Sequence, residues 1–459
     1  MAGTVYDVIV IGAGPTGENV AARAVRGGLT AVIVESELVG GECSYWACTP
    51  SKALLRPVAA VAETAQLRGV AGARLVPSGV LARRDSFAHE WKDDKQVEWV
   101  KNAGVELVRG PGRICGDRLV KVGDAELLAR QAVVVCTGTR AVVPAGLARA
   151  DPWTSREATS AHEVPGRLAI VGGGVVGCEM ATAWQALGAK VTLLSWGPLL
   201  DRLPAFAGHL VAQGLRAAGA EVRTGVSATA ASRAGAGGPV TLTLDDGTTL
   251  EADEVLAATG RAPRTEDIGL ESVGLTPGSW LEVDDTMRVS AVDGGWLYAA
   301  GDVNHLALLT HMGKYQGRIC GDAIACRAGG KEPTVVDRSS AGCVPQVVFT
   351  EPEVAAVGLT PEQARDRGIN VRVVDYEIGE VSGAALWADG YIGHAQMVVG
   401  DNSKTLVGMT LAGPGVGEMI HAATIAIAGE VPLDKLWHAV PSYPTMSEIW
   451  LRLLESYGL

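Results

Sequence analysis

Short apolar runs and glycine-rich turns alternate over the first forty residues. The run at 6–11 is mostly β-branched, as is typical of a parallel strand buried on both faces. A glycine-rich turn at 12–17 follows. Next come an alanine- and valine-rich helix over 18–26 and a second apolar strand over 30–35. The pattern predicts a strand, a turn, a helix and a strand in succession.

The same order returns about 160 residues later. An apolar strand over 167–171 leads into a glycine-rich turn at 172–177, a helix over 178–187 and a strand over 190–194. Two further apolar strands, each ending in Thr-Gly, fall later in the respective copies. This repetition predicts internal duplication and two related domains.

The remainder of the chain divides by composition. Residues 151–165 have the Pro, Ser and Thr content of a linker, and a helix is expected over 310–328. From 347 on, strands and long helices without a glycine fingerprint suggest a third kind of domain. We therefore expect a first domain that begins at 1–150, a second domain related to it at 151–275, a return to the first at 276–340 and a C-terminal domain at 341–459.

Length and charge narrow the class of protein. A chain of 459 residues with 47% hydrophobic content is long enough for several domains. The net charge of −12 argues against nucleic acid or an anionic membrane as a partner. No apolar run approaches a bilayer span or a signal peptide core, so we expect a cytosolic protein without membrane insertion.

Two of the eight cysteines, Cys43 and Cys48, lie unusually close together. In a long cytosolic chain most cysteines are buried thiols, but a close pair is more often catalytic or metal-binding. No further ligands follow at zinc spacing. A redox pair is the better interpretation, and no metal is expected.

The glycine turns carry a physical logic. Gly12 permits a tight turn, Gly14 lets the backbone approach a pyrophosphate, and Gly17 lets helix and strand pack closely. The helix N-terminus attracts the phosphate charge, and Glu35 at the end of the second strand can accept hydrogen bonds from a ribose diol. Two such fingerprints in one chain imply two dinucleotides and electron transfer between them.

The joint order of motifs carries a resemblance that covers essentially the whole chain. G-x-G-x-x-G, C-x4-C-x-P-S-K, a second G-x-G-x-x-G, A-T-G-R-x-P, A-x-G-D and a terminal P-T-x-S-E resemble the FAD-dependent pyridine nucleotide–disulfide oxidoreductases. The resemblance implies an α/β fold with two Rossmann-like domains and a C-terminal α+β dimerisation domain that opens near 348–355. It also implies FAD, NAD(P)H and a homodimer.

The resemblance further implies site residues. On the flavin side they are Gly12, Gly14, Gly17, Glu35, Thr137, Gly138, Asp302 and Thr310. On the nicotinamide side they are Gly172, Gly174, Gly177, Glu179, Ser195, Arg202, Val226 and Gly260. Lys52 is similar to the lysine beside the flavin N5, with Glu179 as its partner. Cys43 resembles the thiol that exchanges with substrate, and Cys48 the thiol that faces the flavin.

The chain departs from the disulfide reductases at its end. They carry a histidine where this chain has Tyr443, and a phenol titrating near pH 10 cannot replace an imidazole as a proton shuttle at neutral pH. His438 is a conceivable substitute, although a surface or packing role is the more ordinary one. Glu448, which would orient the histidine, is left to bond the tyrosine or solvent.

Two further positions bear on acceptor and cofactor. Trp46 between the cysteines, together with the Tyr443-Pro-Thr-Met ending, is similar to soluble transhydrogenases, although those lack the second cysteine that this chain keeps as Cys48. The aromatic residues Tyr45 and Trp46 either stack a flat acceptor such as a quinone or simply pack the helix. Ser195 stands where an NAD-specific acid is usual, and Trp196 and Arg202 where NADP-specific members carry arginines. We expect NADPH to be favoured slightly, with dual use open.

Three functions compete. The first is an FAD enzyme passing electrons from NAD(P)H through the Cys43–Cys48 disulfide to a disulfide or another small acceptor. The second is an NAD(P)H:quinone reductase or transhydrogenase in which the cysteines are peripheral. The third is a flavin-loaded binding or redox-sensing protein.

Overall fold

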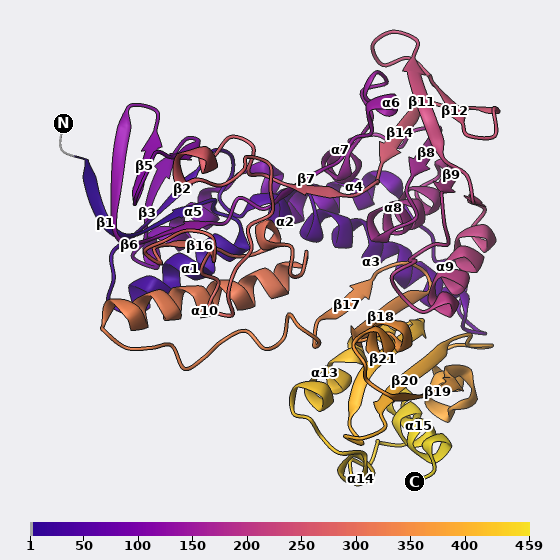
Figure 1. Cartoon of the computed structure of the whole chain (residues 1–459). Coiled ribbons are helices and arrows are strands. Elements are labelled where there is room, and N and C mark those ends of the chain that lie inside the picture. The colour runs from indigo at the N-terminus through magenta and orange to yellow at the C-terminus, as the bar shows by residue number, and fades with distance from the viewer. Residues whose placement is uncertain (1–2) are drawn as a thin grey trace. The chain divides into compact units, whose positions relative to one another are not determined.

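The computed structural model describes residues 3–459 and has the mixed α/β architecture that the sequence predicts (Figure 1). It divides into two compact units, each built from separate stretches of chain. The first unit comprises Met1–Pro50, Asp85–Ala141 and Arg261–Ala341, and the second comprises Ser51–Arg84, Val142–Gly260 and Gly342–Leu459. The boundaries of the four segments drawn from the sequence stay predictions.

A seven-stranded sheet forms the centre of the first unit, in the order β3-β2-β1-β6-β5-β4 with β16 also pairing β6. Its strands are β1 (Thr4–Ile11), β2 (Ala31–Glu35), β3 (Glu106–Arg109), β4 (Gly112–Ile114), β5 (Leu119–Val122), β6 (Ala125–Val135) and β16 (Leu297–Ala299). The strands β1, β2, β3, β6 and β16 pair in parallel, whereas β4 and β5 join antiparallel. A small ribbon joins β7 (Thr139–Ala141) to β15 (Arg261–Pro263).

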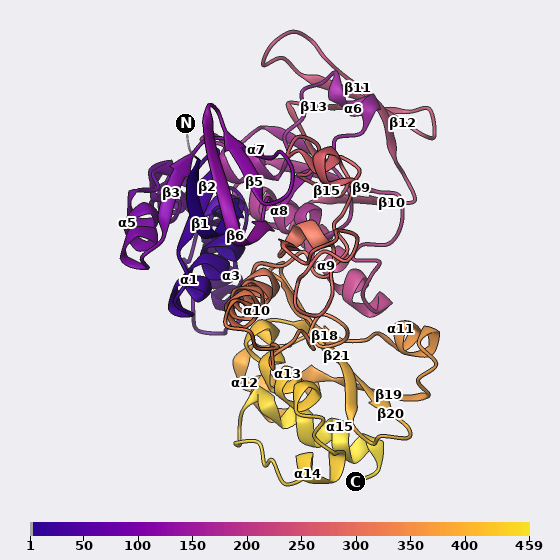
Figure 2. The same ribbon diagram turned by 60° about the vertical axis from the view of Figure 1, so that its left-hand side comes forward.

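Helices α1 and α10 lie side by side against this sheet (Figures 1 and 2). The helical segments that begin in this unit are α1 (Pro15–Arg26), α2 (Gly41–Tyr45), α3 (Cys48–Ala65), η1 (His89–Trp91), α5 (Asp94–Asn102), η2 (Leu270–Val273), η3 (Asp302–Asn304) and α10 (Thr310–Ala328). A Cβ added at Gly313 would lie 2.3 Å from Thr16 Oγ1, and one added at Gly317 would lie 2.7 Å from the carbonyl oxygen of Thr16. These glycines allow the two helices to approach closely, and α10 has the bounds that the sequence predicts.

The second unit holds three sheets. A parallel sheet has the order β10-β9-β8-β14, and an antiparallel sheet has the order β11-β12-β13. Their strands are β8 (Arg167–Val171), β9 (Lys190–Ser195), β10 (Glu221–Thr224), β11 (Ala228–Arg233), β12 (Val240–Leu244), β13 (Thr249–Ala252) and β14 (Glu254–Ala257). The accompanying helices are α4 (Pro77–Phe87), α6 (Ala145–Ala148), α7 (Ser155–Ser160), α8 (Val175–Ala186) and α9 (Ala205–Ala217).

The C-terminal part of the second unit is a five-stranded antiparallel sheet in the order β17-β18-β21-β20-β19. Its strands are β17 (Pro345–Val348), β18 (Glu353–Gly358), β19 (Val371–Glu377), β20 (His394–Gly400) and β21 (Leu406–Gly413). Its helical segments are α11 (Pro361–Asp366), η4 (Ile378–Glu380), α12 (Ser382–Trp387), η5 (Val416–Glu418), α13 (Ile420–Ala428), α14 (Leu433–Leu436), η6 (Met446–Glu448) and α15 (Ile449–Tyr457). Both α13 and α15 pack on this sheet.

Two local expectations need correction. Residues 151–165 are not a plain linker, because α7 forms there behind a capping box in which Thr154 and Glu157 satisfy each other's backbone groups. The long helices expected after residue 347 are also wrong: α13 and α15 have nine residues each. Antiparallel strands occupy much of this segment, and its apolar content reflects burial from the sheet face and not helix length.

The two glycine turns are near copies. In each, the first glycine donates its N–H over 2.8 Å to the next strand, Gly12 to Val34 and Gly172 to Leu194. Both glycines have left-handed backbones, with φ of 106° and 122°. A Cβ on the last glycine of either turn would lie about 2 Å from the first glycine's carbonyl oxygen. The strand–turn–helix repeat predicted from the sequence is therefore confirmed.

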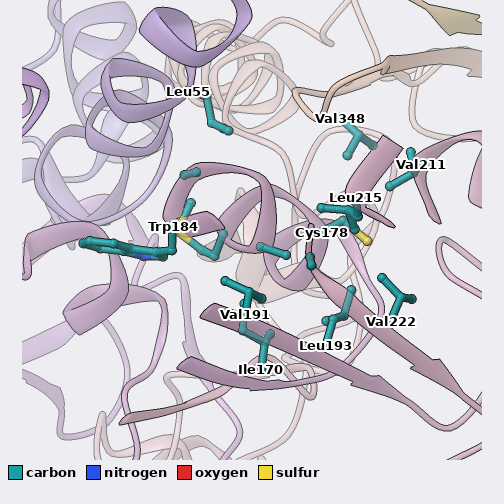
Figure 3. Packing of buried hydrophobic residues seen from close by; sticks show 14 of the residues in the cluster. Leu55, Ile170, Cys178, Trp184, Val191, Leu193, Val211, Leu215, Val222 and Val348 are labelled. Atoms are coloured by element: carbon teal, nitrogen blue, oxygen red, sulfur yellow. The ribbon is translucent and has the colours of Figure 1, made fainter. Parts of the chain in front are cut away.

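A continuous apolar core holds the second copy in place (Figure 3). Helix α8 is buried along most of its length, and Trp184 donates its indole N–H over 3.2 Å to the carbonyl of Ala158 in α7. Leu55 of α3 and Val348 of β17 join the same cluster. Helix α3 thereby anchors the residues that follow the cysteines.

Candidate functional site

The two cysteines meet through their sulfur atoms. Cys43 lies in the short helix α2, and Cys48 is the first residue of α3. Their thiols are hydrogen-bonded, and Cys48 Sγ lies 3.1 Å from Thr310 Oγ1 at the start of α10. The bond to Cys48 raises the pKa of the Cys43 thiol and burial raises it further, whereas Thr310 and the charge of Lys314 lower it. The pair forms a dithiol in contact with α10.

Tyr45 packs within the first unit. Its side chain is fully buried, and its hydroxyl donates to the carbonyl of Val39 at 3.0 Å. The Trp46 ring lies 5.7 Å from the Tyr45 ring, centroid to centroid, and is half-buried. Of the two interpretations of these aromatic residues, packing holds for Tyr45.

A polar chain connects the carboxylate next to Cys43 with Asp302. Arg261 donates to Glu42 Oε2 at 3.0 Å and to the Thr139 hydroxyl at 2.6 Å. Thr139 in turn donates to Asp302 Oδ2 at 2.9 Å. Arg264 donates to the other oxygen of Glu42 at 2.7 Å. Burial raises the pKa of Asp302, while the bond from Thr139 lowers it.

The first glycine turn has the features of an adenine dinucleotide site. Glu35 is buried and accepts the backbone N–H groups of Ala13 at 2.6 Å and Glu37 at 2.7 Å. A Cβ added at Gly14, the residue capping α1, would meet nothing within 4 Å, so open space faces the helix N-terminus. Thr137 Oγ1 is buried without a hydrogen-bond partner in the described chain. An unsatisfied hydroxyl and an open helix end fit a bound FAD.

Several expected flavin-side residues fall in this first unit. They are Gly12, Gly14, Gly17, Glu35, Thr137, Gly138, Asp302 and Thr310. Gly138 follows Thr137 directly, and its carbonyl accepts the Arg264 N–H at 3.0 Å. The carboxyl ends of β1, β6 and β16 bring most of these residues to one edge of the sheet.

Lys52 and Glu179 form an ion pair in the second unit. Lys52 Nζ lies 2.7 Å from Glu179 Oε2, and the lysine also lies over the Phe349 ring at 4.9 Å. The backbone N–H of Phe349 donates to the other Glu179 oxygen at 3.1 Å. Since Cys48 and Lys52 are four residues apart in α3, one helix carries both a thiol and this lysine.

The second glycine turn has a different strand end from the first. Ser195 takes the place that Glu35 has in the first copy; it is only 5% exposed, and its Oγ lies 2.3 Å from where a Gly173 Cβ would be. Its carbonyl accepts the N–H of Val226 at 3.1 Å. A Cβ at Gly174 would meet nothing within 4 Å, so this turn also leaves a helix end open for a pyrophosphate.

The other expected nicotinamide-side residues lie in the same unit. Gly172 and Gly177 shape the turn, and the Gly260 carbonyl accepts the N–H of Val142 at 2.9 Å. Arg202 is exposed, and Trp196 is 82% exposed. This exposure leaves both side chains accessible to a cofactor phosphate.

The C-terminal residues differ from the expectation in one respect. Glu448 is buried and accepts the backbone N–H of Gly383 at 3.2 Å, a partner that the sequence did not suggest. Tyr443 is 76% exposed, and His438 is exposed as well. Glu448 faces inward because α12 and η6 pack closely, leaving no room even for a Cβ at Gly383.

Two charged residues near the site, Glu18 and Lys314, were not predicted from the sequence. Glu18 follows the first glycine turn directly, and burial raises its pKa to about 7. Lys314 lies one helical turn beyond Thr310 and acts electrostatically on both Glu18 and Cys43. The acid after Gly17 was visible in the sequence, but its proximity to Lys314 depends on the packing of α1 against α10.

Within residues 3–459, no group of three or more His, Cys, Asp or Glu side chains is arranged to hold a metal ion. No helix of that stretch is both long enough and apolar enough to cross a membrane.

Fold and site together define an oxidoreductase with two dinucleotide sites and a dithiol. The sequence matches the family model "Pyridine nucleotide-disulphide oxidoreductase" over residues 6–319 and the dimerisation domain of the same family over 344–453. The chain belongs to the pyridine nucleotide-disulphide oxidoreductase family. The predicted resemblance and fold class are thereby confirmed.

Individual proteins that are similar to this chain point to the same family. The dihydrolipoyl dehydrogenase of Thermus scotoductus is 34% identical, with 96% of this chain and 95% of that protein covered. The mercuric reductase of Staphylococcus aureus is 29% identical, with 96% and 81% covered. The Escherichia coli HOCl-induced flavoprotein disulfide reductase RclA, solved as a Cu(II) complex, shares the fold with a TM-score of 0.83, 22% identity and coverage of 98% and 99%.

Membership of the family confirms the general function. The chain is a flavoprotein oxidoreductase that uses FAD and NAD(P)H, and electrons pass between pyridine nucleotide, flavin and a disulfide. Its dimerisation domain supports a homodimer.

Proposed function

We propose that Cys43 and Cys48 are the redox-active pair of this enzyme, and that they relay electrons from NAD(P)H and FAD to a disulfide or another small acceptor. The observation that supports this proposal most directly is the contact between the two thiols. Cys48 Sγ also lies 3.1 Å from Thr310 Oγ1. Their location in the first unit, which also holds the Gly14 turn and the unsatisfied Thr137 hydroxyl, supports this role.

The exchange with a disulfide balances as follows. The Cys43 thiolate attacks one acceptor sulfur, forms a mixed disulfide and displaces the first acceptor thiolate. The Cys48 thiolate then attacks Cys43, closes the enzyme disulfide and displaces the second thiolate. The enzyme dithiol loses two electrons to the acceptor, and its two protons end on the released thiols.

The remaining assignments concern the flavin side. FAD, when bound, accepts a hydride from NAD(P)H and passes the electron pair to the disulfide. Lys52 is proposed to lie beside the flavin and to keep its position through Glu179, which Phe349 also bonds. Gly12, Gly14 and Gly17 would hold the pyrophosphate, and Thr137 and Asp302 would supply polar contacts nearer the flavin.

Tyr443, which stands in place of a histidine, bears on which electron acceptors the enzyme reduces quickly. A phenol does not shuttle protons at neutral pH as an imidazole does, and general acid–base help is typically worth ~10²–10⁴ in rate. Delivery of electrons to disulfides should therefore be slow. A quinone takes electrons without thiol protonation, so quinone reduction at the flavin is the second candidate function.

We further propose NADPH over NADH and a cytoplasmic site of action. Ser195 lacks the charge that would repel a 2′-phosphate, and Arg202 is exposed nearby in the sequence. The buried thiols Cys136, Cys178 and Cys320 suit a reducing compartment. That the electron acceptor is a small molecule is likewise proposed.

Acceptor assays on cysteine and tyrosine variants test this function. Cys43→Ser should abolish turnover of lipoamide or glutathione disulfide and spare quinones, while Cys115→Ser serves as a matched cysteine control. Tyr443→His should raise disulfide turnover, with the rate of flavin reduction by NADPH unchanged. Unaltered disulfide turnover in Cys43→Ser would refute the role of the pair, and rapid disulfide turnover in the wild type would refute the impediment at Tyr443.

A further inference from the structure

We infer that Glu42 is a positioning residue that holds the short helix α2 in place and thereby keeps the Cys43 thiol beside Cys48. The groups responsible are the carboxylate of Glu42 and the guanidinium groups of Arg261 and Arg264, which together we call the Glu42 cluster. The inference rests on the proposed function of the two cysteines. It assigns a task to side chains outside the cysteine pair and outside both glycine turns.

Helix α2 is too short to fix its own position. It has five residues, its N-cap is a glycine without a capping side chain, and an isolated helix of this length is not stable in water. Tertiary contacts must therefore hold it. Near its C-terminal end the ring of Tyr45 is fully buried, and the Trp91 indole donates to the Tyr45 carbonyl over 3.1 Å. Near its N-terminal end, Glu42 makes the contacts with the two arginines.

Both guanidinium groups are anchored independently of the carboxylate. Arg261 and Arg264 donate to the same carbonyl, that of Thr139, over 2.9 Å and 3.1 Å. Each also donates to a different oxygen of Glu42, over 3.0 Å and 2.7 Å. Arg261 begins β15, and the backbone N–H of Arg264 donates to the carbonyl of Gly138. Because the β7–β15 ribbon fixes these donors, they determine where the carboxylate on α2 lies.

Partial burial makes these ion pairs stronger than ordinary surface pairs. The side chains of Glu42 and Arg261 are 21% and 23% exposed, and that of Arg264 is 33% exposed. Charge-assisted hydrogen bonds are screened less at such sites, whereas exposed pairs contribute little. Glu37 offers a comparison in the same unit, because its carboxylate lies 3.8 Å from Arg264, is 45% exposed and lies outside α2.

A fixed α2 favours the disulfide over the dithiol. The Cys43 and Cys48 thiols are hydrogen-bonded to each other, so the observed position of α2 already brings the sulfur atoms together. Closing a disulfide between thiols that are held together costs less conformational entropy than closing it between thiols that move independently. The Glu42 cluster should therefore raise the effective concentration of one thiol at the other and stabilise the disulfide.

The test is the ratio of disulfide to dithiol in the FAD-loaded enzyme, equilibrated without oxygen in dithiothreitol redox buffers. The enzyme dithiol passes two electrons and two protons to oxidised dithiothreitol, which is reduced as the enzyme disulfide closes. Acid quenching, alkylation and mass spectrometry of the cysteine peptide measure the ratio. Glu42→Gln should lower the ratio ~10-fold, equivalent to ~30 mV, and Glu37→Gln should leave it unchanged.

A double-mutant cycle separates the effect of position from that of charge. Glu42→Gln also leaves two guanidinium groups without their carboxylate, and such charges favour the dithiol by stabilising a thiolate. Adding Arg264→Gln removes one of these charges but does not restore the contact with α2. The double variant should therefore have the same ratio as Glu42→Gln.

An unchanged ratio in Glu42→Gln, with or without a lower Tm, would overturn the inference, and so would recovery of the wild-type ratio in the double variant. If Glu42→Gln does not retain FAD, Arg264→Gln is compared with Glu37→Gln instead. Because it loses one ion pair of two, its ratio should fall ~3-fold, and an unchanged ratio would contradict the inference.

The proposed function fails in a different way. Failure of NADPH to reduce a wild-type disulfide that dithiothreitol does reduce would refute the relay alone, because the dithiothreitol equilibrium does not involve NADPH. A wild type that never forms the Cys43–Cys48 disulfide would refute both the relay and the role of Glu42.

Discussion

Lys52 Nζ lies 2.7 Å from Glu179 Oε2, with the lysine 36% exposed and the glutamate only 5% exposed. Helix α8, one of the most completely buried helices of the second unit, thus places a carboxylate where it holds a lysine from the cysteine-bearing helix α3. Removing one partner of a buried pair leaves an uncompensated group, which is far more costly than losing an exposed pair.

Glu179→Gln should lower stability and slow flavin reduction together. The amide keeps the shape but removes the charge that holds Lys52, and one hydrogen bond from Lys52 or Phe349 is lost. We expect a loss of ~1–3 kcal/mol in stability and flavin reduction by NADPH slower by ~10-fold. Thermal unfolding and anaerobic rapid mixing measure these effects. Glu63→Gln, in the exposed Arg56–Glu63 pair, should change neither appreciably.

Gly14→Ala should fold but bind FAD poorly. Its φ of −70° is ordinary for alanine, and a Cβ there meets no protein atom within 4 Å, so the polypeptide itself has room. The added methyl group would instead occupy the space proposed for the pyrophosphate. Wild-type protein should be yellow and release FAD, not FMN, on heating. Gly79→Ala in the exposed part of α4 should retain full flavin content.

Ser195→Glu should shift the cofactor preference from NADPH towards NADH. The first unit shows that a glutamate fits this place: Glu35 accepts the N–H of Ala13, the counterpart of Gly173 in the second turn. An acid at 195 would bond a ribose diol and repel a 2′-phosphate. We expect the ratio of kcat/KM for NADPH over NADH to fall at least ~10-fold, equivalent to about 1.4 kcal/mol. A strong NADH preference in the wild type would contradict the underlying interpretation of Ser195.

Glu351→Gln should make the protein more stable at alkaline pH. Burial raises the pKa of Glu351 to about 7, with Glu353 and Glu63 adding to the effect. Between the unfolded value near 4.5 and about 7, the folded protein binds more protons than the unfolded chain, so stability falls as pH rises through this window. The Tm of the variant minus that of the wild type should be about 2–4 °C larger at pH 8 than at pH 4.5. Exposed Glu362→Gln should leave the pH profile unchanged.

The local motifs were the most predictable part of the molecule. The positions of Gly12 and Gly172 follow from sequence because the turn needs a left-handed backbone, and the strands beside them are strongly apolar. Helix α10 was predicted with its observed bounds. Such features depend on neighbouring residues alone.

Contacts between distant segments could not be predicted in this way. The packing of η6 on α12 turns Glu448 inward to Gly383, and the close approach of α1 and α10 brings Glu18 near Lys314. Neither relationship leaves a periodic pattern in the chain. The helices of the C-terminal part were overestimated because strand and helix burial look alike in short apolar runs.

Anaerobic titration with NADPH tests most directly whether electrons reach the cysteine pair. The wild type should accept about two NADPH per chain, one for the flavin and one for the disulfide, with long-wavelength absorbance after the first from a Cys48 thiolate beside oxidised flavin. Cys43→Ser and Cys48→Ser should each accept about one, and Cys48→Ser should lack that absorbance. Uptake of about one NADPH by the wild type, equal to both variants, would contradict a redox role for Cys43 and Cys48.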